Sequence, residues 1–364
     1  MSEIVIPEIK IGTVWLSERI KIVQENDKEL ILCKLPQGRP IVRIPKYISF
    51  TPDLAWSVGF FIAEGSSAYS GIGIANQEII LIQKFKRVIE KSFGVAGNEW
   101  RVYIKTSEED LEKVAKKWAN ILDISRTKAY YTKLARKDVI ELRLNNTLFS
   151  DIFSSFVENA LVEIQKNKML TLSFLDGYEV GDGSVIQRKG YLYGIVITVK
   201  EAAMKELLVE SYKRLGHAVS VRQTKGCYEV IVRGVRNATR LILDGHFKSS
   251  DRQWKKLIRC YLKKQYTRSH IRYWVALSDG PLSISEIAKR TNRSHWSVRD
   301  ALNQDVKSGL VTMERKHISG KKAPYFKFFS LSENGHILFK ILRENECSGE
   351  DYDEKCIDSG RGGT

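Results

Sequence analysis

The sequence predicts an α+β protein made of two similar halves and a smaller C-terminal domain, and three observations support this. A short apolar helix pattern that ends in an acidic residue, a glycine and a serine occurs twice. Each copy is followed by strand patterns, in which apolar and polar residues alternate, and by amphipathic helix patterns. The C-terminal part has helix-start and turn signals of its own and carries most of the positive charge.

The repeated stretch predicts two helices with small residues on one face. Its copies occupy Trp56–Ser66 and Leu175–Ser184, and each has a pair of small residues four positions apart: Gly59 and Ala63, then Gly177 and Gly181. The first helix has a clear start, with Thr51 as N-cap, Pro52 at the first position and Asp53 in the first turn. Because small residues let backbones approach closely, we expect the two helices to pack against each other.

Each helix pattern ends in an acid followed by a glycine, Glu64–Gly65 in the first copy and Asp182–Gly183 in the second. We expect both glycines to take the left-handed conformation that often ends a helix. The two acids would then lie side by side, near the negative ends of two helix dipoles. Paired carboxylates attract a cation, and hard oxygen ligands favour Mg²⁺ or Mn²⁺. The backbone carbonyls of Gly65 and Gly183 are weaker candidate ligands.

In these stretches the sequence resembles the LAGLIDADG homing-endonuclease family in its single-chain, two-motif form. Gly59 and Gly177 fall on the first conserved glycine of the motif, and Glu64 and Asp182 fall on its metal-binding acid. The resemblance covers roughly residues 52–245. It implies a monomeric endonuclease that hydrolyses phosphodiester bonds with a divalent metal, at a long, pseudo-palindromic site in double-stranded DNA.

The family also has a polar or basic residue after the second strand of each half, which orients water or balances charge. The corresponding positions are Asn76-Gln77 and Val199-Lys200. The resemblance therefore implies a catalytic set of four residues: Glu64, Asp182, Gln77 and Lys200. Only the second half has a lysine, so we expect the two DNA strands to be cut unequally.

Each half has the element order α-β-β-α-β-β-α. In the first half we expect strands at 71–75, 99–105 and 139–144 and helices at 79–93, 108–122 and 147–164, the one at 108–122 being an extra helix. In the second half we expect strands at 184–188, 192–198, 219–224 and 228–232 and helices at 201–215 and 235–243. Two four-stranded sheets under the helix pair would form a saddle that fits duplex DNA. Its candidate DNA-binding residues are Arg188, Lys189, Arg222, Lys225 and Arg233.

The C-terminal region has helix and turn signals of its own. A helix at 271–277 precedes a capping box at Ser283 and Glu286, which opens a helix at 284–291. Ser294 caps a further helix that extends to Lys307, and strands at 310–315 and 325–331 and a helix at 333–342 follow. This order resembles a winged helix-turn-helix domain over roughly 268–342, with the helix from Ser294 to Lys307 as recognition helix. The resemblance implies DNA contacts from helix and wing: Ser294, His295, Trp296, Arg299, Asn303, Lys321 and Lys322. Asp305 departs from the pattern, which has an apolar residue there.

Charge and composition point to a polyanionic partner. The net charge is +16, of which residues 248–344 carry +13. No apolar run is long enough to span a membrane, no signal-peptide pattern opens the chain, and the five cysteines show no CxxC spacing. We expect a cytoplasmic protein, associated with the nucleoid in a prokaryote.

The expected organisation is an N-terminal β-rich lead-in at 1–50, the two halves at 51–165 and 166–247, a basic linker helix at 248–267, the winged helix at 268–344 and an acidic tail at 345–364. Two alternatives to an endonuclease remain open. One is a DNA-binding transcription regulator that keeps the saddle without cleavage, and the other is a maturase that binds intron RNA.

Overall fold

A computed structural model describes residues 8–10, 20–35, 41–68, 71–263, 265–317 and 325–346. The chain divides into two compact units, and each is described by itself. The first consists of the described residues of Met1–Ser184, Val196–Ile231 and His246–Asp251. The second consists of those of Val185–Ile195, Val232–Gly245 and Arg252–Thr364. The fold is mixed α+β, as predicted.

The N-terminal segment forms the expected meander. Strands β2 (Ile20–Glu25), β3 (Glu29–Lys34) and β4 (Ile41–Pro45) make an antiparallel sheet in that order. Its first turn is fixed by Asn26, whose side chain accepts hydrogen bonds from the backbone N–H groups of residues 28 and 29. A separate pair, β1 (Glu8–Lys10) and β5 (Tyr47–Ser49), leads into the first motif helix.

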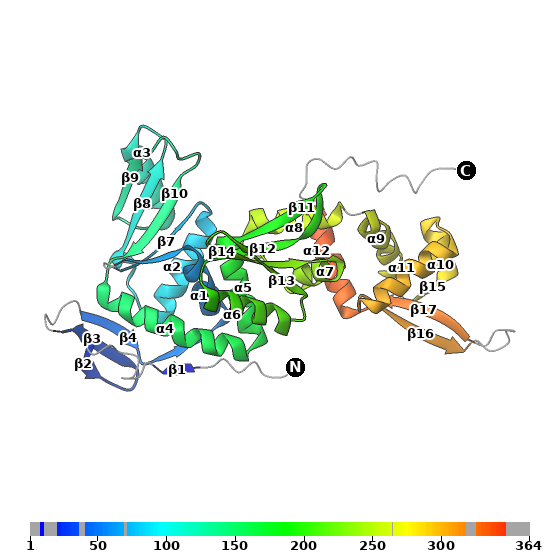
Figure 1. Cartoon of the computed structure of the whole chain (residues 1–364), viewed down its shortest axis with the longest axis horizontal. Helices are drawn as coiled ribbons and strands as arrows, with labels where there is room; N and C mark the ends of the chain where they lie inside the picture. Colours follow the sequence, from blue (N-terminus) through cyan, green and yellow to red (C-terminus); the bar gives the residue numbers. More distant parts are fainter. Residues whose placement is uncertain are drawn as a thin grey trace. The chain divides into compact units, whose positions relative to one another are not determined.

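The two motif helices are α1 (Pro52–Glu64) and α5 (Lys168–Asp182), and they pack against each other at the centre of the first unit (Figure 1). Thr51 caps α1 by accepting a hydrogen bond from the Leu54 N–H at 3.3 Å, as predicted. Asn167 caps α5 in the same way. The middle of each helix is buried on all sides, from Leu54 to Phe61 in α1 and from Phe174 to Val180 in α5, which explains their apolar sequences.

In the first half, both helices and strands lie between the two motif helices. They include β6 (Gly65–Ala68), β7 (Gly71–Asn76), α2 (Ile79–Phe93), β8 (Trp100–Thr106), α3 (Leu111–Leu122), β10 (Val139–Leu144) and α4 (Thr147–Lys166). Two strands lie outside the expected ranges: β6, and β9 (Thr127–Tyr131), which pairs with β8 in parallel through the α3 crossover. The sheet therefore has five strands, in the order β6-β7-β10-β8-β9, and the prediction of four was wrong. The sequence of β9 resembles a basic loop, because most residues of this strand are exposed and it has no buried apolar side.

The second half has the predicted four strands. They are β11 (Gly183–Arg188), β12 (Tyr191–Val199), β13 (Val219–Thr224) and β14 (Cys227–Arg233), in the order β11-β12-β14-β13. Helix α6 (Ala202–Arg214) joins the two hairpins, and α7 (Val235–Leu243) follows the last strand. Both hairpin turns contain glycines with positive φ, Gly190 (+80°) and Gly226 (+78°), as expected for tight connections.

The prediction that Gly65 and Gly183 are left-handed helix ends was wrong. Their φ values are −82° and −91°, which is extended backbone, and each residue begins a strand directly. Glycine is needed here for space: an added Cβ would lie 2.1 Å from the Phe61 carbonyl oxygen at Gly65 and 2.5 Å from the Glu179 carbonyl oxygen at Gly183. The chain thus turns from helix to strand without an intervening residue.

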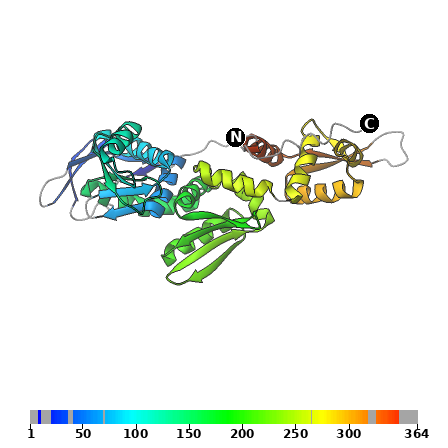
Figure 2. The ribbon, with the colours of Figure 1, turned by 90° about the horizontal axis from the view of Figure 1, so that it is seen from above.

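The described residues of the C-terminal region form five helices and a small sheet. Helices α8 (Asp251–Leu262) and α9 (Gln265–Leu277) precede α10 (Ile284–Thr291) and α11 (His295–Lys307), and α12 (Glu333–Glu346) is the last described element. Strands β15 (Leu282–Ser283), β16 (Val311–His317) and β17 (Tyr325–Leu331) form a sheet in the order β15-β17-β16, which packs on α9, α10 and α11 (Figure 2). Among the described residues, no helix combines the length and the apolar character of a membrane span.

Two features of this region explain its sequence. The capping box at Ser283 is present, with the Glu286 carboxylate accepting a hydrogen bond from the Ser283 N–H at 2.7 Å. Asp305 is buried, and its carboxylate accepts a hydrogen bond from Trp274 Nε1 at 2.9 Å and lies 2.7 Å from His270 Nδ1. Asp305 of α11 therefore makes polar contacts with α9, where the winged-helix pattern predicts an apolar contact.

Candidate functional site

The interface of the motif helices has room only for small residues. An added Cβ at Gly59 would lie 2.1 Å from the Phe174 carbonyl oxygen, and one at Gly177 would lie 2.0 Å from the Trp56 carbonyl oxygen. One turn further along, an added Cβ at Gly181 would lie 2.6 Å from the Ala63 Cβ and 2.9 Å from the Glu64 Cγ. The backbones are therefore in direct contact, and this contact brings the C-terminal ends of α1 and α5 together.

Glu64 is partly buried at the end of α1. Its Oε1 accepts a hydrogen bond from Asn76 Nδ2 at 2.9 Å, from the end of strand β7. Burial and the nearby Asp182 carboxylate raise the pKa of Glu64 to about 7, although the bond from Asn76 opposes the shift. The negative charge of Asp182 therefore disfavours ionisation of Glu64.

Asp182 lies at the end of α5 and is more exposed than Glu64. Burial raises its pKa to about 6, and the positive charge of Lys200 opposes this shift. Lys200 itself is exposed and follows strand β12. Burial, followed by the negative charge of Asp182, also raises the pKa of Tyr178. The structure thus places Glu64, Asp182 and Lys200 in one neighbourhood of the first unit.

Asn76, and not its neighbour Gln77, contacts the acid of the first half. Asn76 is partly buried, and its side chain also accepts a hydrogen bond from the Glu78 N–H at 2.8 Å. The Gln77 side chain is exposed. Because successive residues of a strand face opposite sides, a shift of one position decides which residue reaches Glu64.

Two acids within the second motif form a buried network that sequence reasoning missed. Glu179 is fully buried, and its carboxylate accepts hydrogen bonds from the Tyr212 hydroxyl and from the Phe247 N–H at 3.2 Å, and lies 2.5 Å from His246 Nδ1. Asp176, one turn earlier, accepts hydrogen bonds from Ser249. These contacts hold the segment that follows α7 against α5. A signal was present in the sequence, since acids in an otherwise apolar helix require buried donors.

The basic residues predicted on the second sheet differ in their surroundings. In the second unit, the Arg233 guanidinium donates a hydrogen bond to the Tyr193 hydroxyl at 3.1 Å, and Arg188 lies 5.9 Å from the centre of the same ring. In the first unit, Arg222 forms an ion pair with Glu229, which offsets its charge. Lys189 and Lys225 precede the glycines of the two hairpin turns.

The first sheet presents a basic and aromatic face that was not predicted. Buried and open positions alternate along β8, where Trp100, Val102 and Ile104 are buried. The opposite face is formed by residues of three strands, and its side chains are Arg101, Tyr103, Lys105, Lys128, Tyr130, Glu141 and Arg143. The Tyr103 and Tyr130 ring centres are 6.2 Å apart, and the Arg143 guanidinium lies 5.6 Å from the Tyr103 ring centre. The alternation of charge and tyrosine in β8 was the available signal.

Helix α11 exposes the predicted residues on one side. His295, Trp296, Arg299 and Asn303 are exposed, whereas Val298, Ala301 and Leu302 are buried. The Ser294 hydroxyl caps the helix by accepting a hydrogen bond from the Ser297 N–H at 3.2 Å, so it serves the helix start. The predicted wing residues Lys321 and Lys322, like the acidic tail beyond residue 346, lie outside the described residues.

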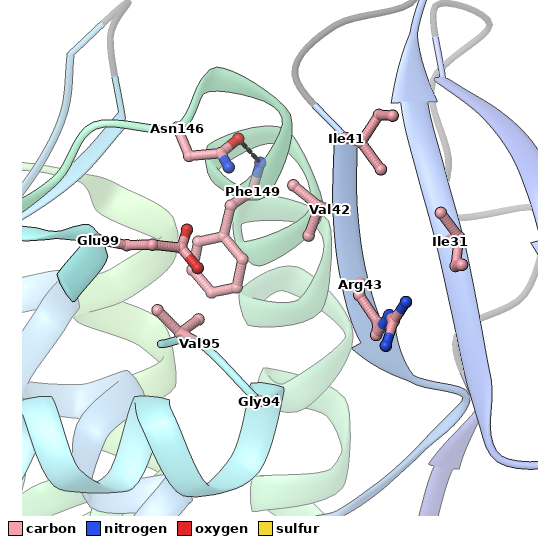
Figure 3. A pocket seen from close by; sticks show the side chains of 9 residues that line it. All are labelled: Ile31, Ile41, Val42, Arg43, Gly94, Val95, Glu99, Asn146 and Phe149. Carbon is pink, nitrogen blue, oxygen red and sulfur yellow. Dashed lines mark hydrogen bonds between the residues drawn. The ribbon is translucent and has the colours of Figure 1, made fainter. Parts of the chain in front are cut away.

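A separate pocket of about 410 Å³ lies between the N-terminal sheet and the first half (Figure 3). Its lining combines apolar and polar side chains, and Asn146 accepts a hydrogen bond from the Phe149 N–H at 3.0 Å. The lining residues are Ile31, Ile41, Val42, Arg43, Gly94, Val95, Glu99, Asn146 and Phe149, and none belongs to the predicted site.

No family model and no curated protein matches the sequence. Solved structures that it resembles are LAGLIDADG domains. The N-terminal LAGLIDADG domain of WhiA is 13% identical, with a TM-score of 0.35, over 56% of this chain and 86% of that one. Mesophilic variants of the homing endonuclease I-DmoI are 12% identical, with a TM-score of 0.35, over 54% and 96%. Full-length WhiA from Thermotoga maritima is 12% identical, with a TM-score of 0.35, over 71% and 91%.

Proposed function

We propose that this protein is a divalent-metal-dependent endonuclease that cleaves duplex DNA, with Glu64 and Asp182 as the metal-binding acids. The observation that carries the proposal is the pairing of these two carboxylates at the contacting ends of α1 and α5. Both have raised pKa values, about 7 and about 6, because the site is partly buried and, for Glu64, because a second carboxylate is close. Two such acids fit a magnesium ion, which typically binds one or two carboxylates and completes its coordination with water and substrate phosphate.

The chain's own residues have distinct roles in this proposal. Asn76 fixes the orientation of the Glu64 carboxylate through its hydrogen bond, and Lys200 supplies positive charge beside Asp182. A divalent ion held by the two acids would activate water and stabilise the leaving oxygen during phosphodiester hydrolysis. The basic and aromatic face of the first sheet and the Arg188–Tyr193–Arg233 cluster would bind the DNA backbone.

The C-terminal helices and sheet have the order of a winged helix, and we propose that α11 adds a second DNA contact. Trp296, Arg299 and Asn303 share the exposed side of α11, where they could reach base edges. Both motif helices belong to one chain, which supports a monomer with a pseudo-palindromic target.

The function is tested by incubating the purified protein with a pool of randomised 40-bp duplexes, with Mg²⁺ or with EDTA. Sequencing of the ends should reveal Mg²⁺-dependent double-strand cleavage at a preferred site. Specific binding without cleavage in Mg²⁺ or Mn²⁺ would instead support a DNA-binding regulator. One observation favours that second candidate. Lys200 lies near Asp182, but the residue that contacts Glu64 is the neutral Asn76, so a catalytic lysine is missing in the first half.

We expect strand cleavage to be unequal because of this difference. Lysine can stabilise the negative charge of the pentavalent phosphate, which an amide does less well. Lys200→Met should slow cleavage of one strand by about 100-fold. Gln77→Ala, which changes an exposed side chain, should change neither strand by more than threefold. A time course on supercoiled plasmid carrying the preferred site should show nicked intermediates, and equal rates for both strands in the wild type would contradict this prediction.

The stability of the metal-free protein should fall as the pH rises. The pKa of Glu64 is raised from 4.5 to about 7, so the folded protein binds this proton more tightly than the unfolded chain does. The resulting stabilisation is present below pH 4.5 and is lost as the pH rises through 7. Relative to Glu64→Gln, the wild type should lose about 2 kcal/mol of unfolding free energy between pH 4.5 and 7.5, after allowance for partial exposure.

Added metal should reverse this loss only where the acids are ionised. Thermal unfolding should show that 10 mM Mg²⁺ raises the melting temperature at pH 7.5 and has little effect at pH 4.5. Glu64→Gln should weaken the response at pH 7.5. A response of equal size at both pH values would place the metal elsewhere.

A further inference from the structure

Strand β9 has no counterpart in the second sheet. The second sheet ends at β13, next to β14, whereas the first continues past β8 to β9. The register pairs Tyr103 with Lys128 and Lys105 with Tyr130. Paired residues of neighbouring strands project to the same face, so Lys128 and Tyr130 extend the open face of β8 by one strand.

The extension carries positive charges and no negative ones. From Arg126 to Lys137 the chain carries five Lys or Arg residues and no Asp or Glu: Arg126, Lys128, Lys133, Arg136 and Lys137. All five are exposed. Tyr130 is 49% exposed although its ring lies near Tyr103, and Leu134 is 92% exposed. A surface that combines cations with open aromatic rings suits nucleic acid, because cations pair with phosphates and rings contact sugars and bases.

The spacing also suits a DNA backbone. Side chains on one face of a strand repeat about every 6.8 Å, which is roughly two base-pair rises of 3.4 Å. Each strand adds about 4.8 Å across the sheet, or between one and two base pairs. The segment after β9 adds three further exposed cations, Lys133, Arg136 and Lys137.

We propose that β9 and the segment to Lys137 form an additional DNA-backbone contact, so that the first half protects about one to three base pairs more than the second half. This inference rests on the proposed DNA-binding function. It assigns the partner by charge complementarity and by continuity with the basic face of β8. Helix α3 connects β8 to β9 and packs on both strands, so the surface is supported by folded structure.

The first measurement is the salt dependence of affinity for a random-sequence 40-bp duplex, without divalent metal. Each lost phosphate contact lowers the slope of log K against log salt concentration by about 0.9. The triple variant Lys128→Ala, Lys133→Ala, Arg136→Ala should therefore lower the slope by about 2 to 3. The matched control is Lys113→Ala with Lys116→Ala, two exposed lysines of α3 in the same insertion, and its slope should be unchanged.

The second measurement is a hydroxyl-radical footprint on the duplex that the protein prefers. The wild type should give a footprint that is longer on one side, and the triple variant should lose protection only at that outer end. Circular dichroism and melting temperature verify that each variant is folded.

The outcomes separate this inference from the proposed function. If the wild type binds the duplex with a steep salt slope and the triple variant matches it, the β9 surface is a solvated strand edge and the inference alone is wrong. If the variant affects binding of single-stranded RNA but not of duplex DNA, the assigned partner is wrong. If the wild type does not bind duplex DNA at all, both the inference and the proposed function fail.

Discussion

Glu64→Gln and Asp182→Asn should each abolish Mg²⁺-dependent cleavage while leaving DNA affinity within about tenfold of the wild type. Each substitution replaces a carboxylate oxygen, a preferred magnesium ligand, by an amide of the same shape. Each also removes a negative charge close to where a phosphate would bind, so affinity for DNA is expected to stay equal or to rise. The rate should fall by at least 10³-fold, because the metal supplies both the nucleophile and the charge stabilisation.

Cleavage rate and affinity are measured separately. Single-turnover cleavage with excess protein gives the rate, and fluorescence anisotropy in Ca²⁺ gives the affinity. Glu112→Gln is a matched control, because Glu112 is an exposed acid of α3 that pairs with Lys116 at 2.8 Å. It should cleave as the wild type does. Wild-type rates in both site variants would rule out the two acids as metal ligands.

Local signals in the sequence were sufficient for most of the fold. The start of α1 could be predicted because Thr51, Pro52 and Asp53 act within one turn, and the ends of α2 and α6 could be predicted because Gly94 and Gly216 adopt positive φ. Strand β9 could not be predicted, because its pairing with β8 depends on the crossover through α3, and this leaves no local pattern in the sequence. Its residues alternate only between exposed and half-buried positions.

The positions of the two acids at the ends of the motif helices could be predicted from the sequence. The residues that contact these acids were harder to predict. The five-residue spacing from glycine to acid places Glu64 and Asp182 at equivalent ends of packed helices. Which of Asn76 and Gln77 reaches Glu64 depends on where strand β7 ends, and a one-residue error reverses the face. The Glu179–His246 contact joins residues that are 67 positions apart, so only the folded chain reveals it.

The largest loss of stability is expected from Gly59→Ala and Gly177→Ala. In most helices this substitution stabilises by roughly 1 kcal/mol, because alanine is the better helix former. Here the added Cβ would lie 2.1 Å and 2.0 Å from carbonyl oxygens of the opposite helix, and backbone atoms cannot rotate away as a side chain does. The helices must separate instead, which disturbs packing along the whole interface.

We therefore expect a loss of about 3 kcal/mol or more for each variant, which would lower the melting temperature of the first unit by roughly 10 °C. Differential scanning calorimetry is the suitable measurement, because it gives the unfolding temperature and enthalpy of each variant directly. Gly97→Ala is the control: an added Cβ there meets only the Glu90 Oε1 atom, at 3.4 Å, and that side chain can move. Helix separation would also move Glu64 away from Asp182, so metal binding should weaken together with stability. If both glycine variants unfold at the wild-type temperature, α1 and α5 do not meet through their backbones, and the two acids lose the contact that brings them together.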